Sequence, residues 1–194
     1  MKKLIILMYN IIFMTWYRLC GLKIKITSFI GFEKHLRGCR FIRIGKNTRI
    51  RRHITINCYG KYRGEKLSPQ LLIGNNVYIN DGFMCLVTDK VTIENNVTVG
   101  PNVSVMSHNH GLNPESQSYL DNKLEIAPVT LKDGCWIGDK SIILPGVIVG
   151  KKAVIGAGSV VTKSIDDYAM AVGNPARIIK RYNLETKKWE KVNG

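Results

Sequence analysis

The sequence lacks the features that mark disulfide-rich, zinc-thiolate or disordered proteins. Its five cysteines are an odd number without a CxxC pair, which argues against a disulfide framework or a thiolate metal site. Only six of the 194 residues are proline, so the 18 glycines do not indicate a disordered chain. We therefore expect reduced cysteines that pack as small buried side chains. The 45% hydrophobic content is enough for the core of one domain.

A long uninterrupted apolar run is also missing. Residues 1–20 begin with lysines and an apolar stretch, as a signal peptide does, but no small-residue cleavage site follows. Asn10, Thr15 and Arg18 interrupt the stretch well short of a membrane span. Its apolar residues follow helical spacing. We expect a helix that packs on the domain or lies on a membrane face. The protein is accordingly expected in the cytoplasm or at the inner face of the cytoplasmic membrane.

Acidic residues are scarce in the first third of the chain. Residues 1–66 hold 16 of the 29 Lys and Arg residues but only two of the 14 acidic residues, Glu33 and Glu65. This segment indicates a surface for an anionic partner, such as nucleic acid, membrane lipid or an acidic or phosphorylated glycan. A solvated face that only aids solubility is the alternative. Arg49, Arg51 and Arg52 are expected to favour an anionic or lipid-linked ligand over a neutral one.

From residue 41 onward the sequence contains a repeat of six residues. Counting in sixes finds only aliphatic residues at Leu131, Ile137, Ile143, Val149, Ile155 and Val161. A small residue stands four places after each of the first five. A helix would place apolar residues three and four apart, and an ordinary strand two apart. A period of six with glycine at the corners predicts short strands in a parallel solenoid, whose stacked coils share one core.

Four stretches resemble the hexapeptide-repeat acyltransferases, namely "IGNNVYIND", "VTIENNVTVGPNVSV", "CWIGDKSIILPGVIVGKKAVIGAGSVVTK" and "AVGNPARIIKRY". The chain is most like the galactoside/maltose acetyltransferase group and the capsule and O-antigen O-acetyltransferases. The resemblance covers roughly residues 41–182. It implies an all-β fold, a left-handed parallel β-helix over residues 41–169, between an N-terminal segment (1–40) and a C-terminal segment (170–194). It further implies a homotrimer with active sites between subunits, acetyl-CoA as acyl donor, and a glycan rather than nucleic acid as partner.

The stretch "VMSHNHG" holds half of the four histidines. The hexad pattern stops after Val105 and resumes at Leu131, so residues from about 106 to 130 are expected to loop out. By the resemblance this excursion carries the catalytic histidine, and the motif falls on His110. An imidazole within hydrogen-bond reach can take the proton of a sugar hydroxyl as the oxygen attacks a thioester. Because no recognisable nucleophile triad is present, we expect direct transfer.

The residues around His110 leave some roles open. The carboxylate that would orient its ring is not evident, and Asp121 and Glu125 are only candidates. His108 receives no separate role. A zinc site is the alternative for this histidine pair, but zinc needs three protein ligands and an open position. The remaining histidines lie far upstream, so no metal is expected.

The same resemblance assigns the other site residues. Asn80 contacts the acceptor or the oxyanion, unless it is a structural asparagine at a corner. Tyr78 lies on the acceptor side, and Trp136 forms a cleft wall against pantetheine or the acceptor ring, or else covers a subunit interface. Thr88 replaces an acidic residue of the galactoside group, so the sugar specificity does not transfer. The coenzyme contacts are Asp139, Ala157, Thr162, Lys163, Arg177 and Lys180, of which the last two meet phosphates.

These expectations converge on an acetyl-CoA-dependent O-acetyltransferase. Its acceptor is a sugar hydroxyl in bacterial surface-polysaccharide biosynthesis. The alternative enzyme N-acetylates an amino sugar nucleotide, because a neutral amine needs the base less. A non-catalytic solenoid scaffold is the alternative of another class.

Overall fold

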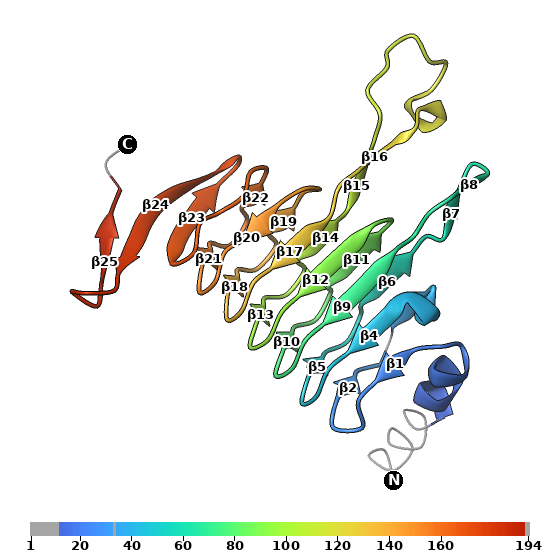
Figure 1. Ribbon diagram of the computed structural model, residues 1–194, viewed down its shortest axis with the longest axis horizontal. Helices are drawn as coiled ribbons and strands as arrows, with labels where there is room; N and C mark the ends of the chain where they lie inside the picture. Colours follow the sequence, from blue (N-terminus) through green and yellow to red (C-terminus); the bar gives the residue numbers. More distant parts are fainter. Residues whose placement is uncertain (1–11, 33, 193–194) are drawn as a thin grey trace.

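The computed structural model describes residues 12–32 and 34–192. They form a solenoid of short parallel strands, in which each coil contributes one strand to each of three sheets (Figure 1). This is the parallel solenoid that the period of six predicted and the left-handed β-helix that the family resemblance implied. We call the sheets A, B and C in the order in which a coil visits them, and we name each corner by the two sheets that it joins.

Each sheet is a stack of strands from successive coils. Sheet A joins β1 (Lys23–Ile24), β4 (Ile42–Ile44), β9 (Gln70–Ile73), β12 (Lys90–Ile93), β17 (Val129–Leu131) and β20 (Ile148–Val149). Sheet B joins β2 (Phe29–Ile30), β5 (Arg49–Ile50), β10 (Tyr78–Ile79), β13 (Thr98–Val99), β18 (Trp136–Ile137), β21 (Val154–Ile155), β23 (Ala169–Gly173), β24 (Ala176–Asn183) and β25 (Lys188–Lys191). Sheet C joins β3 (His35–Arg37), β6 (Thr55–Cys58), β11 (Met84–Val87), β14 (Ser104–Met106), β19 (Ile142–Ile143) and β22 (Val160–Val161).

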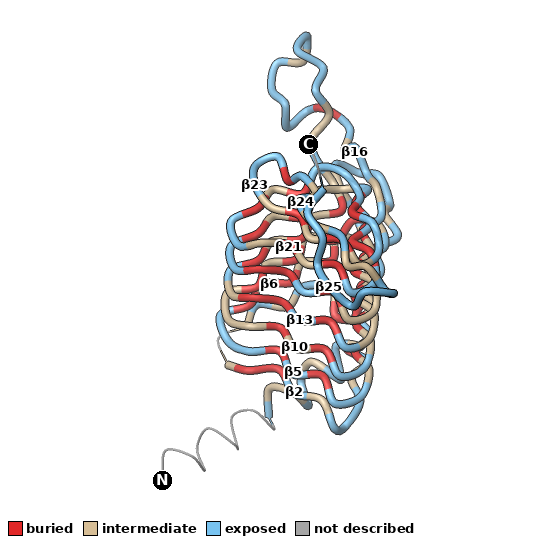
Figure 2. The backbone as a smooth tube through the Cα atoms, turned by 90° about the vertical axis from the view of Figure 1, so that its left-hand side faces the viewer, coloured by how far each residue is buried: buried red, intermediate tan, exposed pale blue. Residues whose placement is uncertain are grey.

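The hexad positions point into the core, as expected. All six aliphatic residues counted from Leu131 are fully buried. The parallel register stacks Ile79, Val99, Ile137 and Ile155 directly above one another in sheet B. Figure 2 shows buried positions recurring on every coil along the length of the solenoid. A column of apolar side chains therefore runs through the stack, which a single coil could not bury by itself.

The cysteines are free, and all but one are buried. Burial raises the pKa of Cys58 and of Cys135 to about 12. Such thiols stay protonated near neutral pH and act as small apolar side chains. Cys20 is the exposed one and departs from this expectation.

The coils begin earlier than residue 41, where the sequence placed the start of the β-helix. β1, β2 and β3 pair in parallel with β4, β5 and β6 and so form a complete first coil. Ile24, Ile30 and Leu36 also follow a spacing of six. Two extra residues near the 3₁₀ turn η1 (Cys39–Phe41) put them out of phase with Ile44. The count from residue 44 therefore missed this coil.

Three excursions leave the solenoid at the C–A corner (Figure 1). The first is η1, and the second is a hairpin of β7 (Lys61–Tyr62) and β8 (Glu65–Lys66). The third is the expected loop, whose base is an antiparallel ladder of β15 (His108–His110) and β16 (Leu124–Ile126) with η2 (Tyr119–Asp121) beyond it. The candidate catalytic His110 thus shares one edge of the molecule with the hairpin.

The N-terminal helix spans residues 12–19 within the described part of the chain. Met14 and Tyr17 pack against the core, whereas Ile12, Trp16 and Leu19 are exposed. This part of the expected helix therefore packs on the domain, and its residues 1–11 lie outside the described residues. Among the described residues, no helix is long and apolar enough to cross a bilayer. Contact of the exposed apolar stripe with a membrane stays a prediction, which co-sedimentation with anionic vesicles tests.

Candidate active site

The root of the loop is fixed by a buried serine that sequence reasoning did not single out. Ser107 is fully buried, and its hydroxyl accepts hydrogen bonds from the backbone N–H of Thr88 (2.8 Å) and of Asp89 (3.2 Å). The backbone N–H of Ala127 donates to the carbonyl of Ser107 at 3.0 Å. One end of the excursion is therefore tied to the neighbouring coil, and the other end is tied to the first. Because Ser107 is held in this way, the strand β15 that follows it starts from a defined position.

His110 lies half-buried on β15, beside the hairpin. Its Nδ1 is 3.4 Å from the hydroxyl of Tyr62, and the same hydroxyl donates to the carbonyl of Leu120 at 2.9 Å. A tyrosine hydroxyl has one proton to donate. Since that proton goes to Leu120, the oxygen accepts from the protonated Nδ1 of His110. This network assigns the tautomer that leaves Nε2 of His110 free to act as a base.

The β7–β8 hairpin also holds the loop tip. Arg63 donates to the carbonyl of Leu120 at 3.2 Å, and its guanidinium lies 2.9 Å from the Asp121 carboxylate. Asp121 is thus engaged by Arg63, and Glu125 stands opposite Asn109 in the ladder. Neither candidate carboxylate is hydrogen-bonded to the His110 ring in the described part of the chain. The residue that orients His110 is a tyrosine.

The sequence contained a signal for the hairpin. The hexad pattern breaks between Ile56 and Ile73, and an Arg-Gly pair stands in the middle of this gap. Arg63 and Gly64 both have positive φ, as a two-residue hairpin turn requires. The contact with His110 could not be read from the sequence, because 48 residues separate Tyr62 from it.

His108 lies in a different environment from His110. Its ring meets the ring of Tyr59 edge-on, with the centroids 6.0 Å apart. Its buried Nδ1 has no hydrogen-bond partner among the described residues. Burial, and secondarily the nearby His110, lowers the pKa of His108. His108 is therefore neutral at physiological pH, and its contacts are those of a packed side chain.

We expect Tyr62→Phe to lower kcat about fivefold to tenfold, the value of one neutral hydrogen bond. The phenyl ring keeps the packing but no longer accepts from Nδ1 of His110, so the ring loses its fixed tautomer. The KM for acetyl-CoA should stay the same, and the pH profile of kcat should change. Steady-state kinetics of Tyr62→Phe beside Tyr119→Phe, which removes a hydroxyl from an exposed tyrosine of η2 in the same loop, checks this. Equal losses in the two variants would show that Tyr62 has no particular role.

Several of the other predicted residues gather along sheet B and the B–C corner. Tyr78 and Trp136 stand in one column of sheet B, on either side of Thr98. Trp136 points outward, with 53% of its surface exposed. Asp139 and Ala157 occupy the B–C corner on adjacent coils, where the backbone N–H of Gly158 donates to the Asp139 carbonyl at 2.7 Å.

Asn80 lies at the same B–C corner, two coils before Asp139. Its side-chain oxygen accepts from the backbone N–H of Asp81 at 3.0 Å. The asparagine ladders of the described residues lie instead at the A–B corner, one through Asn47, Asn76 and Asn96 and one through Asn75 and Asn95. Asn80 therefore lies outside those ladders, but its side chain bonds the backbone of its own corner, so its contact with the acceptor or the oxyanion stays a prediction.

The remaining predicted residues lie elsewhere. Thr162 and Lys163 are exposed at the C–A corner directly after β22, which is two strands along sheet C from β14 and the His110 loop. Arg177 and Lys180 lie on β24 at the C-terminal end of sheet B. Within one chain, Asn80 and His110 stand at opposite ends of the sheet C strands. The structure thus brings the predicted residues together in two groups, which a single chain keeps apart.

Among the described residues, no group of three or more His, Cys, Asp or Glu side chains is arranged to hold a metal ion.

The comparisons with known proteins agree with this fold. Residues 128–163 match the family described as bacterial transferase hexapeptide (six repeats). The chain is 31% identical over 195 residues to the Escherichia coli (strain K12) protein called "Putative lipopolysaccharide biosynthesis O-acetyl transferase WbbJ", with 91% of this chain and 96% of that protein covered. It is 36% identical over 117 residues to the galactoside O-acetyltransferase of the same organism, with 60% and 57% covered.

A solved structure shares the fold. A variant of AntD, an N-acyltransferase from Bacillus cereus in complex with dTDP and coenzyme A, has a TM-score of 0.72 to this chain. The two are 22% identical in sequence, and the match covers 87% of this chain and 89% of that one.

Proposed function

The chain belongs to the bacterial transferase hexapeptide family and is an acetyltransferase, and we propose that it transfers the acetyl group of acetyl-CoA to a sugar hydroxyl of a bacterial surface glycan. A relative named as a lipopolysaccharide O-acetyl transferase matches it over nearly the full length of both chains, which supports a glycan acceptor. The observation that carries the chemistry is the His110 imidazole, whose Nδ1 is held by the Tyr62 hydroxyl at 3.4 Å.

The proposed reaction is a direct transfer. Nε2 of His110 takes the proton of the sugar hydroxyl as the hydroxyl oxygen bonds to the thioester carbonyl carbon. The carbon–sulfur bond then breaks, and the departing coenzyme A thiolate receives the proton from the imidazolium. Tyr62 keeps Nδ1 protonated in the resting state, so the lone pair of Nε2 faces the acceptor. Asn80 is proposed to bind the acceptor or the developing oxyanion.

We propose that a homotrimer completes this site. Asn80, Trp136 and Asp139 lie on the B–C side of a chain, whereas His110 and Lys163 lie at the C–A corner. The two groups can meet only if the B–C side of one subunit faces the C–A corner of the next. Such a head-to-tail contact closes into a ring when the rotation suits, and three subunits make the smallest ring beyond a dimer.

The loop itself supports this arrangement less than its length suggested. We expected about 25 residues without periodicity to need a partner subunit for their order. The base of the loop is instead ordered within the chain, by Ser107 and by the hairpin contacts. The trimer is therefore inferred from the separation of the two residue groups within one chain.

Thiol release from acetyl-CoA over a panel of glycans, nucleotide sugars and amino sugar nucleotides tests the proposed function. We expect release with hydroxyl acceptors, and an O-acetyl product by NMR. Release with amino sugars alone would replace the proposal by N-acetylation. Light scattering of the same preparation should give the mass of three chains, and full activity in a monomer would contradict the shared site.

A further inference from the structure

A basic cavity lies at the C–A corner beside the candidate catalytic loop. It has a volume of about 580 Å³ and is bounded by η1 and the β7–β8 hairpin. Its described lining contains no carboxylate and four cations, which are Arg37, Arg40, Lys61 and Lys66. None of the four has an ion-pair partner among the residues that the structure describes. Such a concave cluster of unpaired cations attracts an anion.

The two arginines are positioned by aromatic rings. The guanidinium carbon of Arg37 lies 5.8 Å from the ring centroid of Tyr59, and that of Arg40 lies 4.7 Å from the ring centroid of Phe41. Stacking fixes a planar guanidinium while its N–H donors stay available. Arginine in this state matches the oxygens of a phosphate, which it can bind with two parallel hydrogen bonds.

The two lysines face each other across the hairpin. Lys61 and Lys66 are directly opposite partners in the β7–β8 ladder. Like charges at such a pair of positions destabilise a hairpin. Glu65 does not offset them, because its carboxylate lies 3.3 Å from Lys123 of the loop. A bound anion would remove this repulsion.

The β7–β8 hairpin lies between the cavity and His110, the proposed general base. Successive side chains of a strand point to opposite faces, so Lys61 faces the cavity and its neighbour Tyr62 faces the loop. Tyr62 is the residue whose hydroxyl lies 3.4 Å from Nδ1 of His110. Tyr59, which lines the cavity, also meets the ring of His108. The β7–β8 hairpin alone would therefore separate an anion in the cavity from the His110 imidazole.

We propose that this cavity binds a phosphate or pyrophosphate ester of the acceptor, from which the sugar reaches His110. The inference rests on the proposed function and names its substrate class, a sugar carried on phosphate. A second cavity of about 490 Å³ shares Arg37 and Arg40 and extends to Trp16 and Tyr17 of the N-terminal helix. A nucleoside and a lipid are both carriers with this chemistry, and the acceptors below distinguish them.

The arginines that the sequence favoured for an anionic acceptor fit this role less well. Arg51 Nε lies 3.2 Å from one oxygen of Asp81, and Arg52 Nη2 lies 3.4 Å from the other. The Arg52 backbone N–H, followed by the Arg51 side chain, lowers the pKa of Asp81, so this carboxylate stays ionised. Two of those three arginines are thus already engaged by one carboxylate, which offsets one of their two charges.

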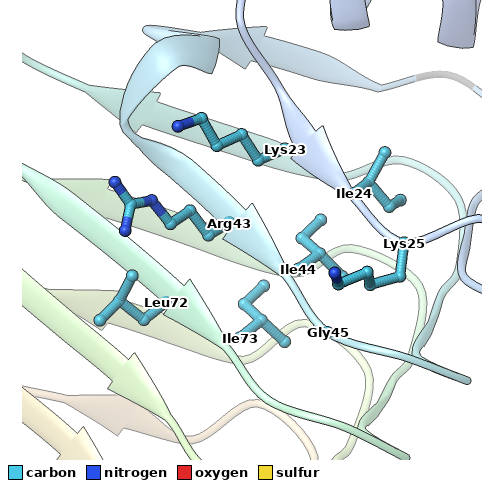
Figure 3. A pocket seen from close by; sticks show the side chains of 8 residues that line it. All are labelled: Lys23, Ile24, Lys25, Arg43, Ile44, Gly45, Leu72 and Ile73. Atoms are coloured by element: carbon cyan, nitrogen blue, oxygen red, sulfur yellow. The ribbon is translucent and has the colours of Figure 1, made fainter.

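A third basic cavity lies on the outer side of sheet A. It has a volume of about 540 Å³, and Lys23 and Arg43 extend along the same side of neighbouring strands there (Figure 3). Its other lining residues include Ile24, Leu72 and Ile73. No aromatic ring lines this cavity to position its cations, and no hairpin links it to His110.

Binding of inorganic pyrophosphate to the full chain, without acetyl-CoA, tests the site directly. Isothermal titration at low salt should show binding that weakens as salt rises, because screening acts on exposed charges. Arg37→Gln with Arg40→Gln, and separately Lys61→Gln with Lys66→Gln, should each weaken it at least about tenfold. The matched control is Lys188→Gln with Lys191→Gln, which removes the same charge from the exposed strand β25. Absence of binding by the unmodified protein, or equal weakening in the control, overturns the proposal.

Thiol release with matched acceptors gives the second readout. The same sugar is offered as a neutral glycoside, on a nucleoside diphosphate and on a short isoprenoid diphosphate. We expect the ratio of kcat/KM for the better phosphorylated acceptor to kcat/KM for the neutral glycoside to fall at least about tenfold in both cavity variants. An unchanged ratio contradicts the proposal. If pyrophosphate binds through these cations but no acceptor releases thiol, the proposed function fails and the anion site stands.

Discussion

Replacement of His110 by alanine is expected to lower kcat about 10²- to 10⁴-fold, the range for loss of a general base. A sugar hydroxyl is a poor nucleophile at neutral pH and needs a base to take its proton. The contact between the Tyr62 hydroxyl and Nδ1 of His110 prepares Nε2 of His110 for that role. The folded state should persist, because His110 lies on an excursion and contributes nothing to the core. Thiol-release assays measure the loss of kcat, and circular dichroism with light scattering of the variant checks that the fold and the assembly persist.

His108→Ala is the matched control for this experiment. The two histidines are on the same short strand, but His108 packs on Tyr59 and burial lowers its pKa. We expect this variant to keep much more activity than His110→Ala. A larger loss at His108 would transfer the base to that residue. If both losses followed a bound metal that chelators remove, a zinc mechanism would replace direct transfer by a histidine base.

The core of this fold could be predicted from the sequence because one geometric rule repeats on every coil. A strand of two or three residues between tight corners turns one aliphatic side chain inward, and the spacing of six follows directly. Ile137, Ile143 and Val149 obey the rule and are fully buried. The first coil was missed because two extra residues near η1 shift the phase of the six-residue repeat. Periodicity therefore located the coils wherever the corner lengths were constant.

The candidate site was harder to predict, because its contacts join segments with no common period. The motif located His110, but the hydroxyl of Tyr62 meets it only because the C–A corners of two coils align. The sequence offered Asp121 as a candidate to orient the His110 ring, but its carboxylate pairs with Arg63 instead. The same alignment gathers Lys61 beside Arg37, which the charge count alone could not do. Lateral stacking of the corners thus determines the site, and the repeat pattern does not contain it.

One core position breaks the size pattern of the repeat and predicts where the solenoid is most sensitive. Phe83 stands four places after Ile79, where later coils have small residues such as Ser141 and Ser159. The backbone ladder stacks Phe83 between Ile54 and Val103. Its side chain is fully buried and is the largest of the fully buried ones among the described residues. The ring therefore fills the width of the core in the third coil.

Phe83→Ala is expected to lower the free energy of unfolding by about 3–5 kcal/mol. The substitution removes a whole ring from an interior that neighbouring coils cannot close without breaking their own register, so a cavity remains. Phe83→Leu should cost far less, about 1 kcal/mol, because most of the volume is kept. Phe29→Ala is the control for the loss of a ring, since 46% of the Phe29 surface is exposed. Urea unfolding at one fixed protein concentration separates these variants, because assembly makes the apparent stability depend on concentration. Equal destabilisation by Phe83→Ala and Phe29→Ala would mean that the third coil relaxes around the missing ring, and that the register of the stack is less rigid than its continuous ladder implies.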